Sequence, residues 1–68
     1  MKKYFTYYGV ELAISPVGFG QYLIEGQSGC YEGATATTTD AEIYDYCDSD
    51  DREAGRWARR AAYHAIKK

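Results

Sequence analysis

The sequence predicts an α+β fold: a three-stranded antiparallel β-meander followed by a short helix and a C-terminal amphipathic helix packed on the sheet. Two observations carry this prediction. Residues 3–38 are rich in β-branched and aromatic residues interrupted by glycine, a composition typical of strands and turns. Apolar residues then recur with helical spacing from Ala54 to Ile66. A chain of 68 residues suits one domain, residues 1–68, around one small core.

The first predicted strand begins at Lys3 and continues to Ile14. Aromatic and β-branched residues are dense up to Tyr8, and Gly9 breaks the alternation, which we interpret as a bulge or bend inside one strand. After Gly9 the apolar residues alternate again, which indicates one half-buried face. The sequence Ser-Pro-Val-Gly at 15–18 is predicted to form the turn that follows.

Two further strands complete the predicted meander. The second covers residues 19–26 and the third covers residues 30–38, and the short polar segment 27–29 joins them as a hairpin. The third strand is weakened at Gly33. Three strands are the fewest that form a stable sheet when one face is covered.

A change of chemistry at Thr39 marks the first helix, which we predict from Asp40 to about Cys47. Thr39 and Glu42 have the spacing of a capping box, in which each side chain satisfies a free backbone N–H at the helix start. Residues 43–47 also alternate in a way that fits a fourth strand. The sequence therefore allows either a helix or a strand for residues 40–47, and we favour the helix.

The C-terminal helix is predicted from a stripe of apolar side chains on one face. The stripe consists of Ala54, Trp57, Ala58, Ala61, Ala62, Ala65 and Ile66. Ser49 or Asp50 is expected to cap the helix. The alanines let the helix approach the sheet closely, and Trp57 is expected to be its main apolar anchor.

The sequence offers no pattern of catalytic or metal-ligating residues. His64 is alone at the border of the apolar stripe, and we expect a partly exposed packing residue rather than a catalyst. No spacing orients a nucleophile and a base, or gathers the ligands of a calcium or zinc site, so we expect no enzyme, no metal and no cofactor. Whether Cys30 and Cys47 pair is left open, although two buried thiols are the favoured interpretation. No apolar run has the length of a membrane helix or a signal sequence, so a cytoplasmic protein is expected.

Formal charge is distributed unevenly along the chain. Residues 40–53 sum to −6 and residues 54–68 to +5, within a net charge of −2. We predict that the acidic segment binds a partner through Asp40, Glu42, Tyr44, Asp45, Tyr46, Asp48, Asp50, Asp51 and Glu53. Carboxylates on a rigid scaffold suit a basic partner, including one that normally binds phosphates, and tyrosines supply the contact area typical of interfaces. Capping of the two helices accounts for some of the same carboxylates.

A basic stripe on the C-terminal helix provides an alternative surface. It consists of Arg56, Arg59, Arg60, Tyr63 and Lys67. Such a stripe fits an acidic protein surface or a phosphate backbone, as in a nucleic-acid-associated regulator. Because the chain as a whole is acidic, we expect direct binding of nucleic acid to be the lesser use. A structural homo-oligomer, such as a homodimer built on sheet edges and exposed tyrosines, is a third alternative.

In its organisation the chain resembles the small accessory proteins of bacteriophages and mobile elements, including anti-CRISPR proteins. The likeness consists of a short acidic chain with a β-meander, a capped helix and an Ala/Arg-rich terminal helix. It implies a non-enzymatic inhibitor or modulator that occupies the surface of a larger protein or ribonucleoprotein complex in the host-cell cytoplasm. Some such proteins imitate nucleic acid with carboxylates. Residues 40–53 agree with that mode of action, whereas the basic stripe departs from a purely acidic mimic.

Overall fold

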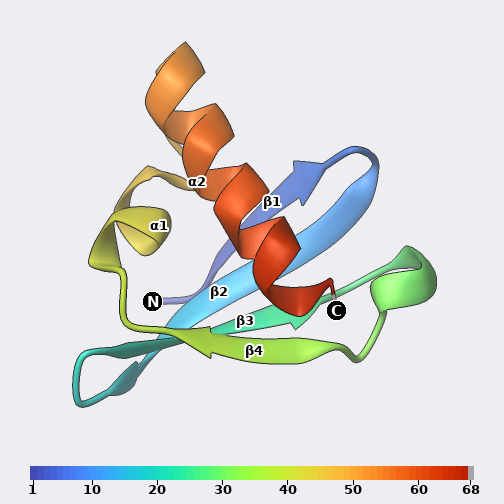
Figure 1. The fold of residues 1–68 in the computed structure, drawn as a ribbon, viewed down its shortest axis with the longest axis horizontal. Helices are drawn as coiled ribbons and strands as arrows, with labels where there is room; N and C mark the ends of the chain where they lie inside the picture. The colour runs from blue at the N-terminus through green and yellow to red at the C-terminus, as the bar shows by residue number, and fades with distance from the viewer. Residues whose placement is uncertain (68) are drawn as a thin grey trace.

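The computed structural model describes residues 1–67 and shows an α+β fold in which two helices cover one face of an antiparallel sheet (Figure 1). The strands are β1 (Lys3–Tyr7), β2 (Val10–Gly18), β3 (Gln21–Gly26) and β4 (Thr35–Thr38), in the order β1-β2-β3-β4. A single 3₁₀ turn, η1 (Gly29–Tyr31), precedes β4, and α1 (Ala41–Tyr46) and α2 (Arg52–Ile66) follow it. The predicted fold class is confirmed, but the sheet has four strands rather than three. Neither α-helix within residues 1–67 has the length and apolar content to cross a membrane.

The fourth strand arises because the predicted first strand is a hairpin. Tyr8 and Gly9 both have positive φ, 51° and 76°, and reverse the chain between β1 and β2. Two successive residues with positive φ match the twist of an antiparallel pair. Gly9 therefore closes a turn instead of forming a bulge. A tyrosine is uncommon at a left-handed position, so the sequence before Gly9 lacks the usual turn signal.

The second turn also lies later than predicted. Residues 15–18 belong to β2, and the chain reverses at Phe19 and Gly20, whose φ values are 56° and 72°. Pro16 is tolerated inside β2 because β1 pairs only as far as Ile14, so no neighbour on that side needs a donor from Pro16. The register of β2 against β3 shifts between Pro16 and Gly18.

The predicted third strand is shorter than the sequence indicates. Only its second half forms β4, because the segment from Gly29 folds back on the end of β3. The Gly26 N–H donates to the carbonyl of Ala34 at 2.8 Å, and the Gly33 N–H donates to the carbonyl of Gly26 at 3.1 Å. These two bonds hold the loop against the sheet edge.

The helix predicted near residues 40–47 is present, and its cap is one residue later than expected. The Asp40 carboxylate accepts from the Glu42 N–H at 3.0 Å, so Asp40 is the N-cap of α1 and Thr39 is not. Aspartate and threonine are both common N-cap residues, so residue type alone does not tell whether Thr39 or Asp40 caps the helix.

The N-cap of α2 is Asp51, rather than Ser49 or Asp50. Its carboxylate accepts from the N–H groups of Glu53 and Ala54 at 2.9 and 2.8 Å. The Ser49 hydroxyl accepts from the Asp51 N–H at 3.0 Å and so shapes the turn that leads into the helix. Three polar residues, Ser49, Asp50 and Asp51, directly precede α2, and the one nearest to the helix, Asp51, caps it.

The core lies between the sheet and the two helices. It contains Phe5, Leu12, Ile14, Ile24, Ile43, Cys47, Ala58, Ala62 and Ile66. The prediction that Trp57 anchors α2 is wrong, because 45% of its side chain is exposed. At Gly55 the helix lies so close to the preceding loop that an added Cβ would be 2.5 Å from the Ser49 carbonyl oxygen. The buried residues in the first three turns of α2 are Gly55, Ala58 and Ala62, and the indole lies on the flank of the helix.

The two cysteines differ in environment and are both free. Cys47 is buried beneath α1, where its thiol donates to the carbonyl of Tyr44 at 3.4 Å. Burial raises the pKa of this thiol. Cys30 is exposed in η1, so the interpretation of two buried thiols is right for Cys47 and wrong for Cys30.

Candidate functional site

The structure assigns part of the predicted acidic site to structural roles. The carboxylates of Asp40 and Asp51 are engaged as helix N-caps. Asp48 forms an ion pair with Lys3, whose Nζ lies 3.3 Å from Oδ1. The other four carboxylates of the segment are exposed and belong to Glu42, Asp45, Asp50 and Glu53. These four carboxylates, together with the solvent-facing oxygens of the capping residues Asp40 and Asp51, supply the negative charge of residues 40–53.

Tyr44 is a structural residue, although it was predicted to bind a partner. Its ring stacks on Tyr22 with centroids 5.1 Å apart, and the Nζ of Lys3 lies 4.3 Å from its centroid. Its hydroxyl donates to the carbonyl of Met1. Tyr44 therefore fastens α1 to the sheet and to the N-terminal end of the chain.

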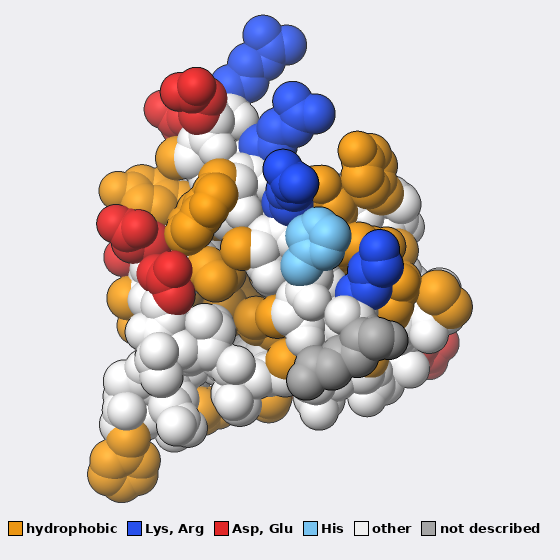
Figure 2. Space-filling view, in the orientation of Figure 1, with side chains coloured by type: hydrophobic (Ala, Val, Ile, Leu, Met, Phe, Trp, Pro, Cys, Tyr) orange, Lys and Arg blue, Asp and Glu red, His pale blue; other side chains and the backbone are white. Residues whose placement is uncertain are grey.

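Tyr46 and Trp57 form an exposed aromatic pair on the outer side of the helices. They line a shallow hollow, which we name the Trp57 surface, with Glu42, Asp51, Glu53 and Ala54. Tyr46 is 42% exposed and Trp57 is 45% exposed. Four residues of the predicted acidic site thus come together here, while Asp45 and Asp50 do not line this hollow. In the space-filling view, acidic side chains gather beside α1 and the start of α2, and basic ones follow the other side of α2 (Figure 2).

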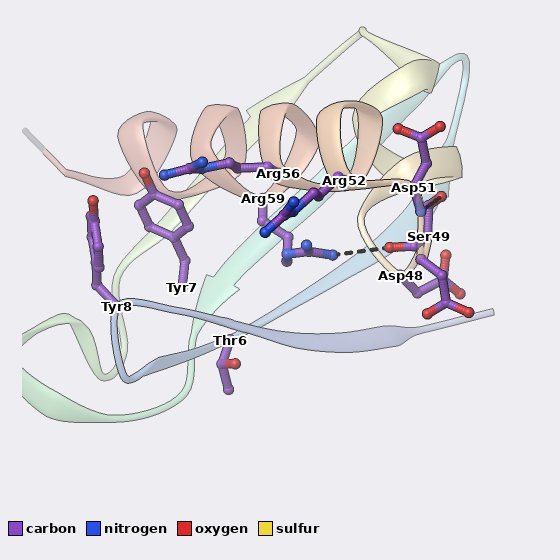
Figure 3. A pocket seen from close by; sticks show the side chains of 10 residues that line it. Thr6, Tyr7, Tyr8, Asp48, Ser49, Asp51, Arg52, Arg56 and Arg59 are labelled. Carbon is purple, nitrogen blue, oxygen red and sulfur yellow. Dashed lines mark hydrogen bonds between the residues drawn. The ribbon is translucent and has the colours of Figure 1, made fainter.

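Two members of the predicted basic stripe face inward. The Nη1 atom of Arg59 donates to the carbonyl oxygens of Cys47 and Ser49 at 3.1 and 3.4 Å (Figure 3). Tyr63 packs on Tyr7 and Tyr31 with centroid distances of 5.1 and 5.3 Å. Arg59 thus donates to the carbonyl of Cys47, the C-cap residue of α1, and to that of Ser49 in the loop that follows. The dipole of α1 favours a positive charge at this end of the helix.

The Tyr63 hydroxyl also lies beside that of Tyr31, with 3.5 Å between the oxygens. This hydrogen bond raises the pKa of Tyr31 to about 12. Lys67 is exposed at the end of α2, where its Nζ lies 5.9 Å from the centroid of the Tyr63 ring. Tyr63 therefore belongs to the packing between α2, β1 and η1.

The exposed cations of α2 form a row of three arginines, Arg52, Arg56 and Arg60, which we name the arginine row. They recur every four residues, so they lie on one side of the helix. Within residues 1–67 none of the three forms an ion pair or a side-chain hydrogen bond. The sequence interpretation left Arg52 out of the basic stripe, although its spacing from Arg56 pointed to the row.

The arginine row faces the tip of the β1–β2 hairpin across a groove (Figure 3). Two adjoining hollows make up this groove, and Tyr7, Tyr8 and Arg56 line both. One hollow extends to Asp48, Ser49, Asp50, Asp51 and Arg52, and the other to Glu53, Trp57, Arg60 and His64. Tyr8 was absent from the predicted site because the hairpin that presents it was not predicted.

His64 is exposed at this groove. Its ring lies edge-on to Tyr63 with centroids 5.7 Å apart. No group of three or more His, Cys, Asp or Glu side chains within residues 1–67 is placed to hold a metal ion. The groove combines guanidinium groups, phenol rings, an indole and one imidazole with the carboxylates of Asp48, Asp50, Asp51 and Glu53.

Because Arg59 is structural and Arg60 is exposed, their replacement by alanine is expected to affect stability differently. Arg59→Ala leaves the carbonyls of Cys47 and Ser49 without their charged donor, and hydrogen bonds to charged groups contribute about 1.5–3 kcal/mol. Arg60→Ala is expected to change stability by less than about 0.5 kcal/mol. Urea unfolding followed by circular dichroism measures both. Equal losses would contradict the inward position of Arg59.

Comparison of the chain with models of protein families, with curated proteins and with solved structures finds no match in any of the three.

Proposed function

We propose that this chain is a non-enzymatic binding protein that modulates a larger protein assembly by attaching its Trp57 surface to a basic region of that assembly. The observation that carries the proposal is the exposed indole of Trp57 beside Tyr46, with carboxylates around both rings. Tryptophan and tyrosine are enriched among the residues that dominate the free energy of protein–protein binding.

The scaffold beneath these rings favours binding at a low entropic cost. Trp57 is followed directly by Ala58, which is fully buried, so the backbone that carries the indole is fixed against the sheet. Tyr46 ends α1, and the next residue, Cys47, is fully buried as well. Because both rings are mounted on packed backbone, only a few side-chain rotations are lost when a partner covers them.

The charges around the rings specify the kind of partner. Glu42 and Glu53 are exposed at the rim of the hollow, and Asp51 adds the outer side of its capping carboxylate. A rim of carboxylates speeds association with a positively charged surface and disfavours acidic partners. We infer a partner with an apolar pocket surrounded by lysine or arginine. Proteins that handle nucleic acids carry such basic surfaces, and the resemblance to anti-CRISPR proteins points the same way.

The test compares partner binding by Trp57→Ala with that by Phe19→Asn. The second variant is the control, because it also removes one exposed aromatic ring. Phe19 is at the β2–β3 turn, outside the Trp57 surface, and asparagine suits its positive φ. Immobilised wild type, Trp57→Ala and Phe19→Asn are exposed to lysate of the cells that produce the protein, and the captured proteins are identified by mass spectrometry. We expect one partner to be retained by wild type and Phe19→Asn and lost by Trp57→Ala.

The captured partner is then purified and titrated against each variant. Removal of a central aromatic residue from an interface is expected to weaken binding by about 2–4 kcal/mol. The double charge reversal Glu42→Lys with Glu53→Lys is expected to slow association most at low salt, because screening already weakens the attraction at high salt. Unchanged affinity of Trp57→Ala, in a variant with an unaltered circular dichroism spectrum, would overturn the proposal.

A further inference from the structure

We propose that the groove between the arginine row and the β1–β2 turn binds a short stretch of single-stranded nucleic acid. In this assignment Arg52, Arg56 and Arg60 contact phosphates, and Tyr8 stacks on a base. The groove shares Asp51, Glu53 and Trp57 with the Trp57 surface, but Tyr8 and the arginine row lie outside that surface, so this assignment goes beyond the protein-binding function proposed above. Its test is independent of whether the Trp57 surface has a partner.

The arginine row forms no ion pair within the described part of the chain, although four carboxylates line the same hollows. Both ion pairs formed among residues 1–67 involve lysines of the N-terminal segment, Lys2 with Glu25 and Lys3 with Asp48. The three arginines repel one another at i, i+4 spacing, which opposes the helix. An anionic ligand relieves that repulsion. Four helical residues advance about 6 Å, a step comparable with the distance between successive phosphates of an extended strand.

The ring of Tyr8 is an exposed platform on a rigid support. It is 80% exposed, and its centroid lies 4.5 Å from that of Tyr7. Tyr7 in turn packs on Tyr63 of α2, with centroids 5.1 Å apart. The exposed ring therefore continues a row of aromatic contacts that reaches into the protein. Stacking of bases on such rings supplies affinity for single strands and tolerates any base.

The arginines proposed to bind phosphates and the ring proposed to stack on a base meet at Arg56. The side chain of Arg56 extends from α2 toward the rings of Tyr7 and Tyr8 (Figure 3). A duplex keeps its bases stacked inside the helix, so it can meet the arginines but leaves Tyr8 without a base. An acidic peptide likewise satisfies the arginines and makes no use of the ring. The combination of ring and cations therefore favours an unpaired strand.

The carboxylates of the groove lie toward the start of α2. Asp48, Asp50 and Asp51 precede Arg52, and Glu53 follows it directly, well before Arg60. The arginine row covers about eight helical steps, which correspond to about 12 Å of helix. This length accommodates two or three phosphates, with the repelling carboxylates at the Arg52 end of the groove.

The experiment measures binding of the full chain to a fluorescein-labelled oligothymidylate by fluorescence anisotropy across a series of salt concentrations. Three phosphate contacts predict that the logarithm of the binding constant falls with that of the salt concentration with a slope of about −2. A labelled duplex and a polyglutamate peptide are the comparison ligands. Both are expected to bind more weakly than the single strand at every salt concentration.

Two pairs of variants locate the site. Tyr8→Asn removes the stacking ring while keeping a residue that suits the positive φ, and Phe19→Asn makes the same change at the other hairpin turn. Tyr8→Asn is expected to weaken binding of the oligothymidylate about fivefold or more, and Phe19→Asn to leave it unchanged.

Arg56→Gln and Lys2→Gln each remove one positive charge, at the groove and at the ion pair with Glu25 respectively. Only Arg56→Gln is expected to reduce the magnitude of the salt slope, by about 0.7. Absence of binding at low salt would overturn the proposal. So would equal affinity for the duplex or for polyglutamate, or unchanged affinity of a folded Tyr8→Asn variant.

Discussion

Replacing Gly26 with alanine is expected to remove a large share of the protein's stability. A Cβ at position 26 would overlap the carbonyl oxygen of Tyr31 and lie 2.8 Å from its carbonyl carbon. Both are backbone atoms, so no side-chain rotation relieves the overlap. The φ of Gly26 is not in the left-handed region, so alanine there causes no backbone strain. The expected loss of stability therefore comes from the steric overlap of the added Cβ alone.

The segment that meets this Cβ cannot move away without losing hydrogen bonds. The carbonyl of Tyr31 accepts from the Ala34 N–H at 2.9 Å, and Gly26 itself bonds to Gly33 and Ala34. On its other side Gly26 pairs with Leu12 of β2. Overpacking of this kind combined with broken backbone bonds is expected to cost more than about 3 kcal/mol. A chain of 68 residues has a stability of about 3–10 kcal/mol, so the loss is a large share of it.

Urea unfolding of Gly26→Ala and of Gln27→Ala, followed by circular dichroism, tests this expectation. Gln27 is the exposed neighbour, and the loss of its side chain is expected to change stability by less than about 0.5 kcal/mol. If Gly26→Ala unfolds at the same urea concentration as wild type, then η1 does not lie against β3 as described.

The parts of the fold that were predictable from the sequence depend on local patterns. Leu12 and Ile14 are buried on the face that the alternation of residues 10–14 predicted, although Ala13 on the opposite face is fully buried too. The spacing of alanines predicted α2, and the polar residues before each helix indicated where the two helices begin. Such signals are local because backbone geometry fixes which side chains share a face.

The turns were harder to predict because they use aromatic residues. Tyr8 and Phe19 both occupy left-handed positions, where asparagine or glycine is the usual choice. The segment containing Pro16 carries stronger turn signals than either true turn, yet it is part of β2. As a result the sequence yielded three strands, and the hairpin tip that holds Tyr8 did not enter the predicted site.

The division of the charged residues between scaffold and surface depends on tertiary contacts. Arg59 and Arg60 are neighbours of the same type, but only Arg59 reaches the carbonyls of Cys47 and Ser49, which follow α1. Tyr44 and Tyr46 likewise differ, since only Tyr44 packs on Tyr22. Composition identified the acidic segment, whereas the orientation of α1 and α2 decides which of its side chains are available to a partner.

Truncation of Ile24 to alanine is expected to cost about 2–5 kcal/mol, the range measured for large aliphatic residues in cores. Ile24 is fully buried in β3, between Ile14 of β2 and Ala36 of β4, on the face that the helices cover. Both α1 and α2 contact β3. The space left by three carbon atoms is therefore enclosed on all sides. Ile24→Val, which removes one carbon atom, is expected to cost about 0.5–1.5 kcal/mol.

Leu23→Ala is the matched control, because it removes three carbon atoms from the adjacent residue of the same strand. Leu23 lies on the opposite face of the sheet, beside Ser15 and Thr37, and is only half-buried. Its truncation is expected to cost about 1 kcal/mol, since a partly exposed side chain loses less burial and leaves no closed cavity. Urea unfolding of the three variants at several protein concentrations measures these costs. If Leu23→Ala costs as much as Ile24→Ala, the outer face of the sheet is itself buried in solution. A loss that grows with protein concentration would then assign that burial to a second copy of the chain.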